Sequence, residues 1–194
     1  MPIFYRLLVL IFAGLLCACT STGNNKADPY EGFNRSMYSL NKGLDTYVLK
    51  PVATGYDKVT PDFVQDRVGN FMNNFGEVPT LANSLFQVKF KSFFVTAGRL
   101  LVNTTLGIGG LFDPATPMGL ERREEDLGQT LGYWGVPQGP YLMLPLMGPS
   151  TMRDVWAEPG DGLYSMYNQI NHIPTRNTIL GLKLLDTRAS LLPY

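Results

Sequence analysis

An apolar run that ends in two cysteines sets the first limit on the fold. Arg6 is followed by the apolar residues 7–16 and then by Cys17-Ala18-Cys19. A charged start, a short apolar stretch and a small residue before the cut are typical of a secretory signal peptide. The run is shorter than the roughly 20 residues that span a bilayer. Because Cys19 directly follows Ala18, the pattern resembles a bacterial lipobox and predicts removal of residues 1–18 and acylation of Cys19.

Two alternatives stay open for this segment. Cys17 could be the acylated residue, although bulky Leu16 would then precede the cut, and a plain signal peptide with an incidental cysteine is the other alternative. If Cys19 is acylated, residues 20–194 contain no cysteine for a disulfide or a metal site. We therefore expect no cofactor apart from the acyl chains on Cys19. Residues 19–27 are polar enough to serve as a tether, and residues 28–194 suffice for one domain.

The charge balance narrows the class of partner. Acidic and basic residues number 16 each, which argues against an electrostatic nucleic-acid binder. Charged residues make up 16% of the chain, against about 25% in typical soluble domains. A chain with so little charge is expected to bury its surface against a partner or against lipid.

Apolar residues at helical spacing predict an all-α fold, with no strand alternation. Asp28-Pro29 opens a first helix that Pro51 ends, and Thr60-Pro61 opens a second. The further predicted helices are 81–86 after Pro79, 89–106, 151–156 with Ser150 or Thr151 as cap, 162–170, and 176–192. Residues 89–106 are apolar on most sides, which indicates a core or embedded helix and not a transmembrane one.

The residues of common catalytic and metal sites are missing from the sequence. The only histidine, His172, lies in a turn where capping or packing explains it better than catalysis. No nucleophile elbow or phosphate loop occurs. Asp154, Glu158 and Asp161 lack calcium-loop spacing, and solvated charge is their default interpretation. The sequence therefore predicts a protein that is not an enzyme.

Several long runs together resemble the MlaA (VacJ) outer-membrane lipoproteins. They are residues 28–38 (Asp28-Pro29-Tyr30 onward), 103–113, 128–146, 151–154 and 185–189, in the family's order. Members of this family usually continue beyond the position of Tyr194, so we expect a C-terminal segment to be missing from this sequence.

The resemblance implies a ring-shaped helical domain in the inner leaflet of the outer membrane of a Gram-negative bacterium, with a central amphipathic pore. Members remove phospholipid mislocalised to the outer leaflet and pass it to a periplasmic carrier, which feeds an inner-membrane ABC transporter. They also associate with trimeric porins. This component makes or breaks no bond.

A pore that passes phospholipid needs polar side chains for the headgroup. Arg99 and Asn103, one turn apart on an apolar helix, are candidates; a structural ion pair or hydrogen bond is the alternative. The same two interpretations apply to Asn34 and Arg35, where the structural one is favoured.

The segment 128–146 is the predicted moving part. By resemblance it lines the pore and gates it, with Gly132, Gly135 and Gly139 as flexible points and Pro137 as a stiffener. The rings of Tyr133, Trp134 and Tyr141 suit a headgroup boundary. Aromatic packing under a static loop is the alternative. For the whole protein, two rivals remain: an envelope scaffold that moves no lipid, and a periplasmic lipid-modifying enzyme that uses Asp or Glu.

Overall fold

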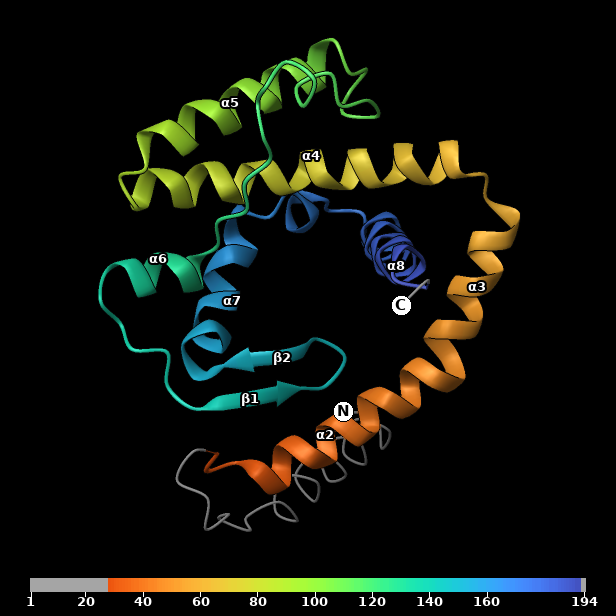
Figure 1. The fold of residues 1–194 in the computed structure, drawn as a ribbon, viewed down its shortest axis with the longest axis vertical. Helices are drawn as coiled ribbons and strands as arrows, with labels where there is room; N and C mark the ends of the chain where they lie inside the picture. Colours follow the sequence, from red (N-terminus) through yellow and green to blue (C-terminus); the bar gives the residue numbers. More distant parts are fainter. Residues whose placement is uncertain (1–27, 193–194) are drawn as a thin grey trace. The chain divides into compact units, whose positions relative to one another are not determined.

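The structure, a computed structural model, describes residues 28–192. Cys19, the signal peptide and the tether lie outside these residues, so their assignments stay predictions. The described chain is mainly helical, as expected, and it falls into two compact units (Figure 1). Unit 1 contains residues 28–44 and Gln138–Met152. Unit 2 contains Asp45–Pro137 and residues 153–192.

Unit 1 combines one helix with one hairpin. Helix α2 (Glu31–Leu44) packs on strand β1 (Tyr141–Leu144), and β1 pairs antiparallel with β2 (Gly148–Thr151). The register sets Tyr141 opposite Thr151 and Leu144 opposite Gly148. Leu146 in the connecting turn has φ +66°, a conformation that a leucine seldom adopts.

Unit 2 is built around the long helix α4 (Asp62–Phe86), which packs on α5 (Phe90–Thr105) and on α8 (Ile173–Ser190). Figure 1 shows α5 and α8 on different sides of α4. The remaining elements of the unit are the π-helix η1 (Asp45–Leu49), α3 (Lys50–Val59), α6 (Leu127–Tyr133), α7 (Met152–Tyr164, whose first residue belongs to unit 1) and the 3-10 helix η2 (Met166–Gln169).

Two expectations about prolines are wrong. Pro51 does not end the first helix; it lies in the first turn of α3, where a missing N–H costs nothing. Pro79 does not start a new segment, because α4 runs through it to Phe86. Pro159 likewise lies inside α7. An interior proline removes one backbone hydrogen bond, and the packing of these long helices on their neighbours outweighs that loss.

The expectation that the chain contains no strands is also wrong. Residues 148–151, expected as a turn capped by Ser150 or Thr151, form β2, and α7 begins at Met152. Strands of four residues are too short to show a detectable alternation, and β2 also contains Gly148 and Pro149. The expected helix 162–170 is instead the end of α7 followed by η2. His172 does cap a helix, but it caps the start of α8, where its side chain accepts a hydrogen bond from the backbone N–H of Thr175.

No helix among residues 28–192 combines the length and the apolar character needed to cross a membrane.

Candidate functional site

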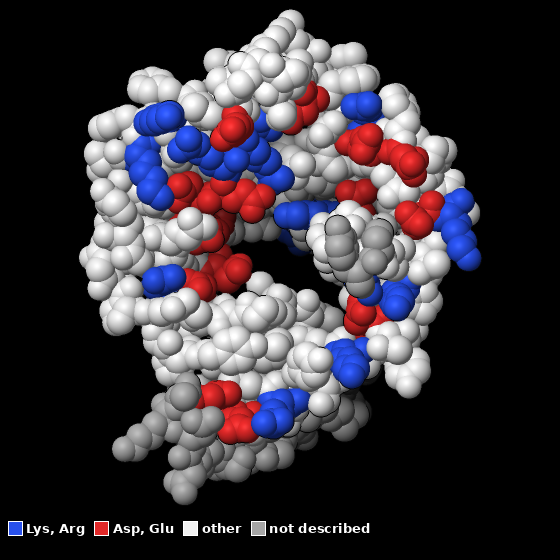
Figure 2. Space-filling model, in the orientation of Figure 1, with Lys and Arg blue, Asp and Glu red and all other residues white. Residues whose placement is uncertain are grey.

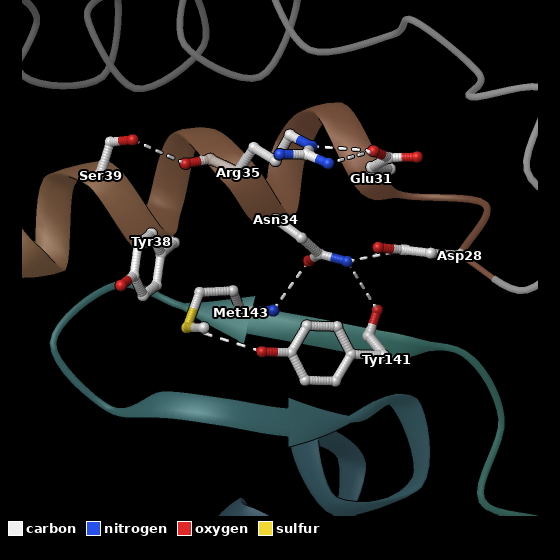
Figure 3. A pocket seen from close by; sticks show the side chains of 8 residues that line it. All are labelled: Asp28, Glu31, Asn34, Arg35, Tyr38, Ser39, Tyr141 and Met143. Carbon is white, nitrogen blue, oxygen red and sulfur yellow. Dashed lines mark hydrogen bonds and ion pairs between the residues drawn. The ribbon is translucent and has the colours of Figure 1, made fainter.

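An open surface pocket of about 620 Å³ lies between α2 and β1 in unit 1 (Figure 3). Its lining combines both signs of charge, two phenol rings and several neutral polar groups. The residues are Asp28, Glu31, Asn34, Arg35, Tyr38, Ser39, Tyr141 and Met143. A pocket of this composition can take a ligand that carries a cation and an anion next to an apolar portion.

Asn34 forms the buried wall of this pocket, with 5% of its surface exposed. Its amide nitrogen donates to the Asp28 carboxylate at 2.9 Å and to the Tyr141 carbonyl at 3.1 Å, and its amide oxygen accepts from the Met143 N–H at 2.8 Å (Figure 3). Each polar atom of the Asn34 side chain is therefore bound within the protein. The structural alternative favoured from the sequence is the arrangement observed.

Asn41 repeats this arrangement two turns further along α2. Its amide nitrogen donates to the Leu144 carbonyl at 2.8 Å, and its oxygen accepts from the Leu146 N–H at 2.8 Å. Residues seven apart lie on one face of a helix, so both amides meet the same strand. We call Asn34 and Asn41 the amide clamp, since together they bond to the backbone of β1 and its turn as a neighbouring strand would. The sequence analysis missed Asn41, although the seven-residue spacing was a usable signal.

Arg35 is exposed on α2 and pairs with Glu31 one turn earlier, at 2.8 Å. An exposed pair at this spacing is weak. The Arg35 guanidinium is therefore accessible at the pocket and available to an anionic group.

Arg99 and Asn103 belong to a buried network in unit 2. Arg99 is 1% exposed and donates to the Glu77 carboxylate at 2.7 Å and to the Asp113 carboxylate at 3.0 Å. Asn103 donates to Asp113 at 3.1 Å and accepts from the Ala115 N–H at 3.1 Å. The network ties α4, α5 and the loop after α5 together. It is the structural ion pair that the sequence left open as an alternative.

Burial and charge act in opposite directions on the carboxyl groups of this network. Burial raises the pKa of Glu77, and the hydrogen bond from Arg99 offsets only part of that rise. For Asp113, burial also raises the pKa, but hydrogen bonds from Thr116 and Arg99 outweigh it and hold the pKa below its ordinary value. Asp113 is therefore ionised where it pairs with Arg99.

A second buried polar set joins α4 to α6 and α7. Gln87 donates to the Thr130 hydroxyl at 2.9 Å, and Thr130 in turn donates to the Asn83 amide oxygen at 2.8 Å. Asn83 donates to the Asp161 carboxylate at 3.0 Å, which also accepts from the Leu127 N–H at 2.9 Å. Sequence reasoning missed this set, since polar residues along a helix look like a solvated face. Asp161, taken as surface charge, is in fact tied into the fold.

The predicted moving segment begins as α6 and continues as irregular backbone. Tyr133 and Trp134 are exposed, and the Trp134 indole donates to the Phe86 carbonyl at 3.1 Å. Gly135 has φ +90° and open space around it, and Gly139 has φ +71°. The other predicted positions are Gly132, which lies against the Arg153 guanidinium, exposed Pro137, and Tyr141 at the start of β1.

Compared with an ordinary soluble domain, the burial of side chains is inverted: the buried side chains are mostly polar, and many large apolar side chains are exposed. Among the described residues, buried polar or charged side chains number twelve and buried apolar ones six, of which four are alanines. Large apolar side chains lie outside instead, with Tyr47, Phe94 and Trp156 each at least two-thirds exposed. Figure 2 shows wide uncharged areas on the face in view. So much exposed apolar surface indicates contact with lipid or with another protein.

Comparison with known proteins matches this geometry to one family. Residues 26–194 match the family described as MlaA lipoprotein. The chain belongs to the MlaA lipoprotein family. It is 36% identical over 185 residues to the intermembrane phospholipid transport system lipoprotein MlaA of Escherichia coli, covering 92% of this chain and 73% of that protein. For the Haemophilus influenzae protein of the same name the identity is 31%, covering 94% and 77%.

A solved structure supports the MlaA fold. It is described as "Structural basis for maintenance of bacterial outer membrane lipid asymmetry" and matches with a TM-score of 0.76 and 34% identity, covering 87% of this chain and 86% of that one. An uncharacterised protein of Rickettsia typhi is 42% identical over 128 residues. The match spans about half the length of that relative, at 51%, and 66% of this chain.

Within residues 28–192, no three His, Cys, Asp or Glu side chains are grouped as a metal would require. Most polar groups of the clamp and of the two buried sets are bound within the protein, and the α2 pocket is one place where the surface can take a ligand.

Proposed function

We propose that this protein is an outer-membrane lipoprotein that removes mislocalised phospholipid from the outer leaflet and passes it to a periplasmic carrier. The inverted burial carries the proposal, because a fold with polar groups inside and large apolar side chains outside is stable when acyl chains surround it. The Escherichia coli relative is a phospholipid transport lipoprotein, and the similar solved structure concerns outer-membrane lipid asymmetry, so both support the same role.

The finer architecture belongs to the proposal as well. The helices would form a ring in the inner leaflet with an amphipathic central pore, beside a trimeric porin, and the carrier would deliver lipid to an inner-membrane ABC transporter. Acyl chains on Cys19 would hold the ring at the membrane, since two or more chains anchor firmly where one does not. The protein would act as a passive conduit and not as an enzyme.

The α2 pocket is the proposed contact for the headgroup. Arg35 would meet the phosphate, and the Tyr141 ring would lie at the boundary with the acyl chains. Tyr133 and Trp134, which belong to unit 2, would each lie at a headgroup boundary of their own unit. Asn34 would act as a positioning residue for this pocket, because its polar atoms already bind protein partners.

Movement of the segment 133–140 would gate the path, with Gly135 as its hinge. Proline cannot adopt the φ of +90° seen there, and it would also remove the hydrogen bond from the Gly135 N–H to the Gly132 carbonyl. We expect Gly135→Pro to raise outer-leaflet phospholipid and detergent sensitivity in cells. Gly135→Asn, which tolerates a positive φ, is the matched control and should stay near wild type. Equal phenotypes of the two variants would argue against a hinge.

The transport role is tested by rescue of a deletion strain, with outer-leaflet phospholipid as the readout. Wild type should restore low outer-leaflet phospholipid, Cys19→Ser should fail through misrouting, and Cys17→Ser should succeed. Purified protein should co-isolate with intact phospholipid. Release of lyso-lipid or fatty acid on incubation would indicate the enzyme instead. A porin complex without bound lipid, together with normal lipid asymmetry in the deletion strain, would indicate the scaffold.

A further inference from the structure

Arg67 on α4 is held between two aromatic rings at the surface of unit 2. Its guanidinium carbon lies 4.5 Å from the centre of the Phe63 ring, one turn earlier on α4, and 4.2 Å from the centre of the Phe112 ring in the loop after α5. Contact with two rings restricts the movement of the guanidinium and favours its charged form at this position.

The donors of Arg67 are largely unmatched. Its Nη1 makes one long hydrogen bond, 3.4 Å to the Leu111 carbonyl, and the Asn70 amide donates to the same oxygen at 3.3 Å. The Nε atom is buried without a partner. No carboxylate of the described residues forms an ion pair with Arg67, whereas every donor-bearing nitrogen of Arg99 is bound. A fixed cation with unmatched donors in an apolar setting indicates a missing anionic partner.

The space next to Arg67 is suited to such a partner. An open pocket of about 520 Å³ is lined by Arg67, Leu106, Ile108, Phe112, Asp113 and Pro114. Leu106 and Ile108 are each about two-thirds exposed, at 65% and 66%. The single acidic residue of the lining, Asp113, already accepts from Arg99, Asn103 and Thr116, so its charge is matched within the fold.

We propose that Arg67 binds the phosphodiester of a resident glycerophospholipid, with one acyl chain lying along Leu106 and Ile108. A planar guanidinium donates to two phosphate oxygens at once, and the apolar rim would exclude water from that contact. The inference rests on the proposed membrane setting, but it concerns a lipid that stays bound at the surface of unit 2 and not the lipid that is transported from the α2 pocket.

Native mass spectrometry of the purified full chain tests this site with three probes. Phosphatidylglycerol supplies phosphate and chains, diacylglycerol supplies chains alone, and glycerol 3-phosphate supplies phosphate alone. We expect wild type to bind one phosphatidylglycerol molecule at this site. The affinity of Arg67→Gln for phosphatidylglycerol should be lower by about tenfold or more. Arg67→Lys should bind phosphatidylglycerol more tightly than Arg67→Gln but less tightly than wild type, because lysine keeps the charge and loses the planar arrangement of donors. Diacylglycerol binding should be equal in all variants, and glycerol 3-phosphate should bind far more weakly than the lipid.

Lys58→Gln is the matched control, because it removes one exposed charge from α3 in the same unit; it should keep the bound lipid. The circular dichroism spectrum of Arg67→Gln should match that of wild type, which separates loss of a site from loss of the fold. An equal number of bound phosphatidylglycerols in wild type and Arg67→Gln would overturn the proposal. So would intact lipid binding combined with loss of porin co-isolation in Arg67→Gln, since Arg67 would then meet an acidic group of a protein. Neither outcome bears on the deletion-strain rescue, so the two proposals can fail separately.

Discussion

The two units hold their polar interiors in different ways. In unit 2, the buried cation Arg99 binds the carboxylates of Glu77 and Asp113 and fixes a loop to two helices. In unit 1, the neutral amides of Asn34 and Asn41 bind the backbone of a short hairpin. A buried charge that loses its partner is very costly, whereas an amide that loses its partner costs about as much as one or two ordinary hydrogen bonds. Unit 2 is thus built to stay in one arrangement, and the hairpin of unit 1 is held by bonds that can exchange with water.

The largest effect is expected at the charged network. Arg99→Met would leave two carboxylates without their cation, and we expect the free energy of unfolding to fall by about 3–5 kcal/mol. Chemical unfolding in detergent, followed by circular dichroism, measures it. Adding Glu77→Leu to Arg99→Met should recover part of the loss because it removes one stranded carboxylate. A loss below about 1 kcal/mol in Arg99→Met would contradict the contrast between the units.

A smaller and more local effect is expected at the amide clamp. Asn34→Leu keeps the volume of the side chain and leaves the Tyr141 carbonyl and the Met143 N–H unmatched, so we expect a loss of about 1–3 kcal/mol. Hydrogen exchange should speed up at β1 and β2 and stay unchanged at α4 and α5. Asn177→Leu on exposed α8 is the control and should change stability by less than about 0.5 kcal/mol. Uniform loss of protection across both units would show that the hairpin is not a separately released element.

Acid should weaken unit 2 through Asp113. Burial raises the pKa of Asp113, but hydrogen bonds from Thr116 and Arg99 hold it below the ordinary 3.8, so folding favours the ionised form. The stability that Asp113 contributes is therefore complete above about pH 4 and is lost as the pH falls through the lower, folded-state pKa. Unfolding followed from pH 5 downward should show wild type converging on Asp113→Asn, and parallel curves would exclude Asp113 as a source of the acid sensitivity.

The smallest effect is expected at the surface of the α2 pocket. Arg35→Gln breaks an exposed pair with Glu31 and should change stability by less than about 0.5 kcal/mol. If Arg35 meets a phosphate, the same variant should still raise outer-leaflet phospholipid in cells. A clear loss of stability would instead give Arg35 a structural role like that of Arg99.

An element could be predicted from the sequence when its pattern repeats over many residues. The apolar spacing around Phe90 to Leu101 located α5 because a helix repeats over many residues. The strands were missed because each spans only four residues, and β1 is also held by α2 side chains about a hundred positions earlier, such as Asn34 at Tyr141. Pro79 was misleading because the local pattern does not show that α4 packs on α5 and α8, and this packing outweighs the lost hydrogen bond.

The polar residues show the same limit. The sequence does not show whether an arginine is fully buried or half-buried. Only the structure shows that Arg99 pairs with Glu77 and Asp113. It also shows that Arg67 instead lies against two phenyl rings. The amphipathic helical fold was within reach of the residues alone, while the family resemblance supplied the lipid path.

The amide clamp also orders events during synthesis. A chain made from its N-terminus produces α2 first, yet the backbone groups that Asn34 and Asn41 bind follow 107 and 103 residues later. Until then, α2 carries two unmatched amides and an apolar stripe with nothing to cover it. Whatever protects the nascent chain must therefore hold α2 until residue 151 has emerged, so that this early segment is among the last to reach its final contacts.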